Sequence, residues 1–179
     1  MTLEADFLTS AADKLAENVD RIETCLRELP PHALWARDSE SENAVGNLLL
    51  HLEGNVRQWI LSGIGAGLDE RDRPSEFSAR TGASASVLFG SLRGTVGEAV
   101  ALIRSLRHRR LAEAVSIQGY DTTVLSAIFH VVEHFSGHTY QIILLTKRFT
   151  GEDLGFYSYL DKTGRREAEQ NASDRAVGE

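Results

Sequence analysis

The amino-acid sequence predicts an all-α fold, a four-helix bundle with a long crossover loop between the second and third helices. Apolar residues recur at three- or four-residue spacing in four separate stretches, as they do on the buried face of an amphipathic helix. No stretch shows a strong two-residue alternation, which is the pattern of a half-buried strand. We therefore expect four long helices and no sheet.

The first two helices are bounded by clear signals. The first is predicted over residues 3–29, and Pro30 and Pro31 end it because proline lacks a backbone donor and clashes with the preceding turn. Leu34 and Trp35 are expected to fold back over the end of the bundle. The second helix runs from about residue 43 to residue 62. Cys25 lies beside the apolar seam of the first helix, and we interpret it as a small buried side chain rather than as a reactive nucleophile.

A charged, glycine-containing loop over residues 63–83 follows the second helix, and its length makes it a candidate lid or partner surface. The third helix is predicted from Ser84 to Arg107. Gly90, Gly94 and Gly97 fall close to one face of it; we favour close helix packing there, with space for a ligand as the alternative.

The fourth helix is predicted from an N-cap in the Asp121-Thr122-Thr123 cluster to about Lys147, with Leu125 and Phe129 among its core residues. These elements make one domain over residues 1–160. Residues 161–179 are charged and nearly devoid of large apolar groups, so we expect a disordered tail.

Composition excludes several classes of function. The chain has 179 residues, 42% of them hydrophobic, which suits one domain with one core. A formal net charge of -7 argues against nucleic-acid binding, which depends on neutralising phosphates. A single cysteine excludes an intramolecular disulfide, the N-terminus is too acidic for a secretory signal, and no uninterrupted apolar run reaches the roughly 18 residues of a membrane span. We expect a cytoplasmic protein without a membrane partner.

Four histidines form the candidate site. His130, His134 and His138 recur at a spacing of four, which stacks them along one face of the fourth helix. His51 lies at the margin of the apolar face of the second helix. A lone histidine there would ordinarily be a satisfied core residue, but the second cluster favours a shared metal site, because imidazole is the commonest metal-binding side chain.

His51, placed opposite His134 and His138, completes three nitrogen ligands, and three ligands leave coordination positions open, as in a catalytic site. The spacing differs from the zincin motif, since Phe135 stands where a zincin has its glutamate and Glu133 precedes the first ligand.

Residues 48–60, Leu-Leu-Leu-His-Leu-Glu-Gly-Asn-Val-Arg-Gln-Trp-Ile, and residues 130–142, His-Val-Val-Glu-His-Phe-Ser-Gly-His-Thr-Tyr-Gln-Ile, resemble the DinB/YfiT-like superfamily of candidate metalloenzymes. More narrowly, the chain resembles a bacterial branch described as a domain of unknown function. The likeness extends over residues 3–160 and includes the segments 117–120 and 153–157.

The resemblance implies a four-helix bundle, often a homodimer, with a divalent metal ion, zinc or nickel, held by His51, His134 and His138. His130 is not one of the usual three ligands, so it is expected to support a ligand or to replace one. Tyr140 stands where the family commonly has glycine, and its bulk would narrow the site or add a phenol to it. Characterised relatives include transferases and isomerases that use low-molecular-weight thiols such as mycothiol or bacillithiol.

The function expected from these residues is a metal-dependent reaction on a small molecule, in the manner of a thiol-dependent transferase. The alternatives are hydrolysis by a metal-activated water, with Glu133 or His130 as proton acceptor, and a metal-binding or interaction protein without catalysis. The candidate catalytic residues are thus Glu133, His130 and Tyr140. Open coordination positions that face a pocket would favour an enzyme.

Overall fold

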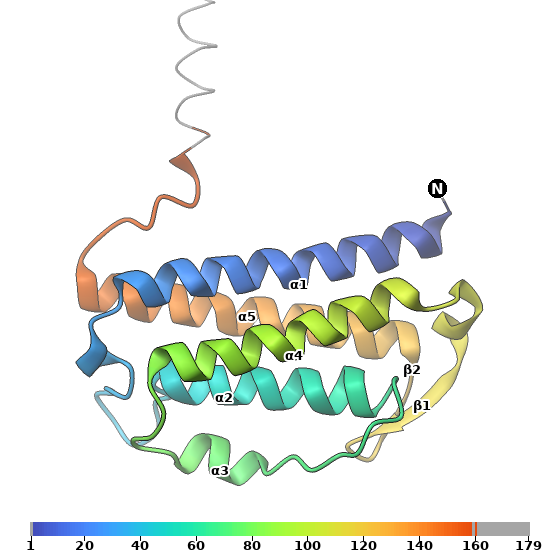
Figure 1. The fold of residues 1–179 in the computed structure, drawn as a ribbon, viewed down its shortest axis with the longest axis horizontal. Helices are drawn as coiled ribbons and strands as arrows, with labels where there is room; N and C mark the ends of the chain where they lie inside the picture. Colours follow the sequence, from blue (N-terminus) through green and yellow to red (C-terminus); the bar gives the residue numbers. More distant parts are fainter. Residues whose placement is uncertain (1, 159, 161–179) are drawn as a thin grey trace, which may run out of the picture.

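A bundle of four long helices forms the body of the protein (Figure 1), as predicted. The computed structural model describes residues 2–158 and 160; the predicted tail over residues 161–179 lies outside the described residues. The four long helices are α1 (Leu3–Glu28), α2 (Val45–Val56), α4 (Ala85–Ser105) and α5 (Val124–Thr150). The shorter elements are 3-10 turns at Pro31–Ala33 and His108–Ala112, a π-helical turn at Arg57–Ser62, the helix α3 (Arg73–Ser78), and the strands β1 (Ala114–Ile117) and β2 (Tyr120–Thr123).

Side-chain caps fix where three of the long helices begin. The hydroxyl oxygens of Thr2, Ser84 and Thr123 accept hydrogen bonds from backbone N–H groups in the first turns of α1, α4 and α5. Thr123, which caps α5, thus belongs to the Asp121-Thr122-Thr123 cluster in which the N-cap was predicted. This helix continues to Thr150 and ends at Gly151, whose φ of 73° is the left-handed conformation typical of a helix C-terminus.

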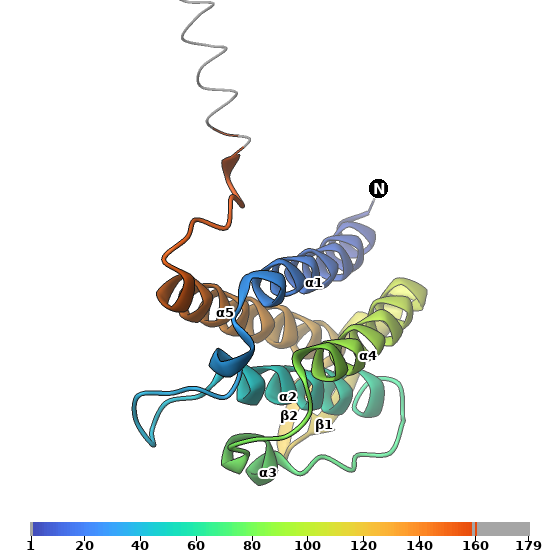
Figure 2. The same cartoon turned by 60° about the vertical axis from the view of Figure 1, so that its left-hand side comes forward.

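The helices enclose one apolar core (Figure 2), in which α1 packs against α4 and α5, and α2 packs against the same two helices from the other side. Leu15, Leu52, Leu92 and Phe135 are fully buried members of the four helices. The prediction that Leu125 and Phe129 belong to this core is wrong. Their exposed fractions are 42% and 61%.

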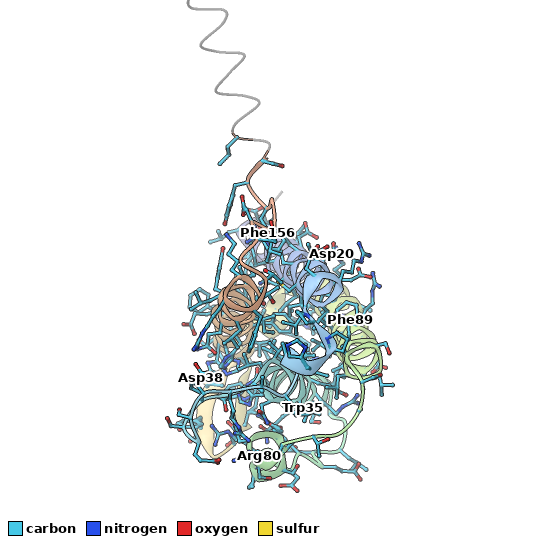
Figure 3. The ribbon with its side chains drawn as sticks, turned by 90° about the vertical axis from the view of Figure 1, so that its left-hand side faces the viewer. Asp20, Trp35, Asp38, Arg80, Phe89 and Phe156 are labelled. Carbon is cyan, nitrogen blue, oxygen red and sulfur yellow. The ribbon has the colours of Figure 1, made fainter. Side chains whose placement is uncertain are left out.

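The connector after α1 closes one end of the bundle (Figure 3). Leu34 is buried, and the indole ring of Trp35 lies so close to Gly46 that a Cβ there would be 2.8 Å from the ring. This confirms that the connector folds back over the helix ends.

The β1–β2 hairpin contradicts the expectation of no sheet. Its strands pair antiparallel from Ala114 with Thr123 to Ile117 with Tyr120. The turn residues Gln118 and Gly119 both have positive φ, 54° and 78°, as a tight hairpin requires. The buried side chain of Ile117 fixes the hairpin to the bundle by packing against Gly63.

Helix α4 differs from two further expectations. The positions of Gly90, Gly94 and Gly97 are exposed, and a Cβ added at any of them would meet no atom within 4 Å, so the close-packing interpretation is wrong. By length and composition α4 could also cross a membrane, with 21 residues and a mean hydropathy of 1.3, although we expected no such run. Helices that pack inside soluble bundles share these properties, and α4 contacts both α1 and α2.

Candidate metal centre

Three histidines from two helices meet at one point beside the core. His51 on α2 is buried, whereas His134 and His138 on α5 are half-buried. The Nε2 atom of His134 lies 3.0 Å from Nε2 of His51 and 3.2 Å from Nε2 of His138. One ligand atom from each residue lies within 4.8 Å of the other two, so the three side chains could hold a metal ion together.

The outer ring nitrogens of two of these histidines have polar partners. His51 Nδ1 lies 2.9 Å from the Glu76 carboxylate, and His138 Nδ1 lies 2.8 Å from the Gln141 side-chain oxygen. Both partners accept hydrogen bonds, which favours a proton on each Nδ1, although Arg71 Nη2, which can only donate, also lies 3.1 Å from His51 Nδ1. In that tautomer each Nε2 carries a lone pair that a cation can bind, which is the usual arrangement for histidine ligands.

The spacing of the Nε2 atoms suits a small divalent ion. A zinc–nitrogen bond is about 2.0–2.1 Å long, so neighbouring nitrogens of a tetrahedral site are about 3.3–3.4 Å apart. The two shorter separations here are 3.0 and 3.2 Å. Nitrogen lone pairs this close repel each other unless a proton or a cation lies between them, and the donor set therefore fits a metal ion.

Electrostatics keep the half-buried pair neutral. Burial, followed by the nearby His138 and His51, lowers the pKa of His134 to about 3. Burial is also the main cause of a lowered pKa at His138, against the opposing effect of its bond to Gln141. Both rings are thus unprotonated at neutral pH, as metal ligands must be.

Sequence reasoning missed Glu76, an acidic residue on α3 that is only 7% exposed. Its carboxylate accepts hydrogen bonds from His51 Nδ1 and from Arg71 Nε at 2.7 Å and Arg71 Nη2 at 2.9 Å. Although burial raises it, the bonds from Arg71 and His51 hold the pKa of Glu76 below its usual value. Arg71 in turn donates to Gln58 on the π-helical turn of the second helix, and Gln58 donates to Asp69.

A glycine on α2 makes room for this carboxylate. A Cβ at Gly54 would overlap Glu76 Oε1 and would lie 3.0 Å from Arg71 Nε. The sequence held two signals of this arrangement, a glycine inside an apolar helix and an Asp-x-Pro helix start at Asp72. Neither signal shows which acidic residue of the loop is buried.

The crossover loop is therefore a wall of the site. Asn47 on α2 donates hydrogen bonds of 2.9 Å to the carbonyl oxygens of Glu76 and Ala79, which ties α3 to α2. In Figure 1, α3 lies along the side of α2 that faces away from α1. The position of Glu76 depends on this docking.

A pocket of about 460 Å³ borders the three histidines. His51 and His134 belong to its wall, together with residues of α3, the hairpin and the first half of α5. The lining residues are His51, Asn55, Trp59, Arg71, Arg73, Gln118, Tyr120, Asp121, Thr122, Ser126, His130 and His134. An ion held by the histidines would thus have a side open to a pocket of substrate size.

The other candidate residues are His130, Glu133 and Tyr140, and of these three only His130 lines the pocket. His130 lines the pocket and packs against Trp59 at a tilt of 44°, with 4.3 Å between ring centroids, while its ring centroid is 5.6 Å from that of His134. Glu133 is exposed and is not a lining residue. Tyr140 also lies outside the lining, and its hydroxyl is 3.1 Å from Arg21 Nη1 on α1.

Comparison with protein families gives a match over residues 2–160 to a model described as "Protein of unknown function (DUF1572)". The chain belongs to the DUF1572 family. No curated protein matches it.

Solved structures of DinB-like proteins share the fold. A DinB-like protein from Bacillus cereus has a TM-score of 0.62 at 17% identity, covering 79% of this chain and 89% of its own. One from Bacillus subtilis has a TM-score of 0.63 at 13% identity, covering 83% and 97%. A conserved protein from Enterococcus faecalis reaches 0.70 at 12% identity, covering 85% and 99%. These structures confirm the predicted resemblance to DinB-like proteins at the level of the fold.

Proposed function

We propose that this DUF1572 protein is a metal-dependent enzyme that joins a small thiol to an electrophilic small molecule. The observation that carries the proposal is the convergence of three Nε2 atoms beside a pocket whose wall includes two of the three histidines, His51 and His134. Structural metal sites are usually closed by four protein ligands, whereas three ligands beside a cavity leave room for a reactant.

In the reaction that we propose, the thiol loses its proton and its sulfur bonds to an electrophilic carbon, while the bond from that carbon to its leaving group breaks. The products are a thioether and the protonated leaving group, so no oxidant is needed. A bound divalent ion would lower the pKa of the thiol, and the thiolate is the stronger nucleophile.

The residues of this chain have separate roles in the proposal. His51, His134 and His138 hold the ion, and Glu76 orients His51 through its Nδ1 proton. His130, on the pocket wall, is the candidate acceptor for the thiol proton. Cys25 takes no part, because it is fully buried in the core.

Hydrolysis is the second candidate function. The same site could activate water rather than a thiol, and His130 is again the acceptor that the pocket offers, since Glu133 is exposed outside the lining. A metal-binding protein without catalysis is the third candidate. Assembly as a homodimer and a cytoplasmic location remain parts of the proposal.

The experiment compares these functions on one preparation. Protein loaded with zinc, nickel or cobalt is mixed with 1-chloro-2,4-dinitrobenzene and a thiol, or with 4-nitrophenyl acetate alone. We expect thioether formation that is lost with a chelator and in His51→Ala. Metal-dependent ester cleavage without a thiol would favour the hydrolase, and the absence of both reactions from metal-loaded protein would favour the non-catalytic alternative.

A further inference from the structure

The pocket beside the histidines carries two opposite charges without ion-pair partners. Arg73 on α3 and Asp121 on β2 both line it. Within residues 2–158 and 160, neither forms a salt bridge. The Arg73 guanidinium instead lies over the ring of Phe77, 4.9 Å from its centroid. Each charge is available to a ligand.

The second arginine of the pocket is not available in the same way. Arg71 donates to both carboxylate oxygens of Glu76 and to Gln58, and its side chain is only 4% exposed. Its charge is balanced inside the wall. Within the described part of the chain, Arg73 is therefore the lining cation without an ion pair and Asp121 the lining anion without one, the first from α3 and the second from the hairpin.

A second observation concerns the polarity of the same wall. Among the described residues, four buried side-chain nitrogen or oxygen atoms lack a hydrogen-bond partner, and three of them belong to pocket residues: Asn55 Oδ1, Trp59 Nε1 and His134 Nδ1. Asn55 and Trp59 are only 4% and 6% exposed. Buried polar groups are normally paired, so this wall of the pocket is unusually rich in unpaired polar atoms.

We propose that the pocket binds a small peptide-like thiol with a free carboxylate at Arg73 and a free ammonium group at Asp121. The proposal rests on the proposed function, since the sulfur would lie at the histidine site. Carboxylate and guanidinium groups form charge-assisted hydrogen bonds, as do ammonium and carboxylate groups. A volume of about 460 Å³ is in the range of sites for molecules of tripeptide size.

The test uses the tripeptide Gly-Cys-Gly in four forms: free at both ends, N-acetylated, C-amidated, and capped at both ends. Each form is titrated into cobalt-loaded protein, with the sulfur-to-cobalt absorption band and calorimetry as readouts. We expect the free form to bind most tightly and each cap to weaken binding about five-fold, as for an ion pair open to solvent.

Variants assign each charge to its partner. Arg73→Gln should weaken binding of the free and N-acetylated forms about five-fold and leave the C-amidated form unchanged, whereas Asp121→Asn should weaken only forms with a free ammonium group. Arg107→Gln and Asp20→Asn are the matched controls, because both residues are exposed, unpaired within the described residues and outside the pocket.

The outcomes separate this inference from the proposed function. Equal affinity for all four forms, or a variant that weakens all forms by the same factor, would overturn charge recognition while metal and thiol binding stand. Protein that retains no cobalt, or that gives no sulfur-to-cobalt band with any form, would overturn the proposed function and this inference with it.

Discussion

His51 and Glu76, 25 residues apart in the sequence, are joined by a 2.9 Å hydrogen bond between Nδ1 and the carboxylate. This bond connects the metal centre to the crossover loop, because Glu76 is held in turn by Arg71. It fixes the ring orientation of His51 and makes its Nε2 a better electron donor. The loop also reaches His51 through Arg71, whose Nη2 lies 3.1 Å from His51 Nδ1, and through Phe77, whose ring centroid lies 4.6 Å from that of His51.

Glu76→Ala should lower metal affinity about 10- to 100-fold, the usual effect of losing a residue that orients a ligand. It should also lower the free energy of unfolding of the metal-free protein by about 3–5 kcal/mol, because Arg71 would stay buried without its counter-charge. Chelator competition and urea unfolding measure the two effects. Glu70→Gln, at an exposed position of the same loop, is the control. If Glu76→Ala bound the metal as tightly as the wild type does, the hydrogen bond between His51 and Glu76 would not support the metal site.

Gly54→Ala tests the space for the Glu76 carboxylate. Alanine in a helix interior ordinarily stabilises a protein by about 1 kcal/mol relative to glycine. At position 54 the added methyl group would displace Glu76, so we expect both stability and metal affinity to fall. Gly94→Ala, with no atom within 4 Å, should instead become more stable. If the two variants gained stability equally, the close contact at Gly54 would be refuted.

His130→Ala should retain more metal affinity than alanine at His51, His134 or His138. Its ring packs against Trp59 and lies outside the group of three that could hold the ion. Its loss should weaken binding by no more than about 100-fold. Competition with a chromophoric chelator measures this difference. If His130→Ala lost all of its metal while one of the other three variants kept it, His130 would be a ligand in place of that residue.

Cys25 should be inert in the folded protein. It is fully buried, and burial raises its pKa from 9.0 to about 11, which confirms the interpretation of a small core residue. Since the folded-state pKa is raised, this thiol stabilises the fold below about pH 9 and that contribution is lost as the pH rises toward 11. A disulfide reagent at pH 8 should label Cys25 in urea but not in buffer. Rapid labelling of native protein would contradict this.

Local sequence signals predicted the four long helices and the meeting of His51, His134 and His138. Pro30 and Pro31 mark the end of α1, and residues four apart necessarily share a face of α5, which brings His134 and His138 together. The hairpin was missed because its strands have four residues each and its Gln118-Gly119 turn is not a common hairpin pair.

Burial of a charged residue in the loop could not be predicted. Glu76 is one of several acidic residues between positions 63 and 83, and only contact with Arg71 and His51 distinguishes it. Such a contact is set by how the loop docks on α2, which is a tertiary property. For the same reason the sequence did not show that Tyr140 meets Arg21 rather than the pocket.

Metal content of the purified, untagged protein tests the central claim most directly. Wild-type protein, reconstituted with zinc or nickel and desalted, should hold one ion per chain, and His51→Ala should hold almost none while keeping its helical circular-dichroism spectrum. The two α5 variants, His134→Ala and His138→Ala, should behave as His51→Ala does. Equal metal content in wild type and His51→Ala, or no stoichiometric metal in wild type, would contradict the three-histidine site.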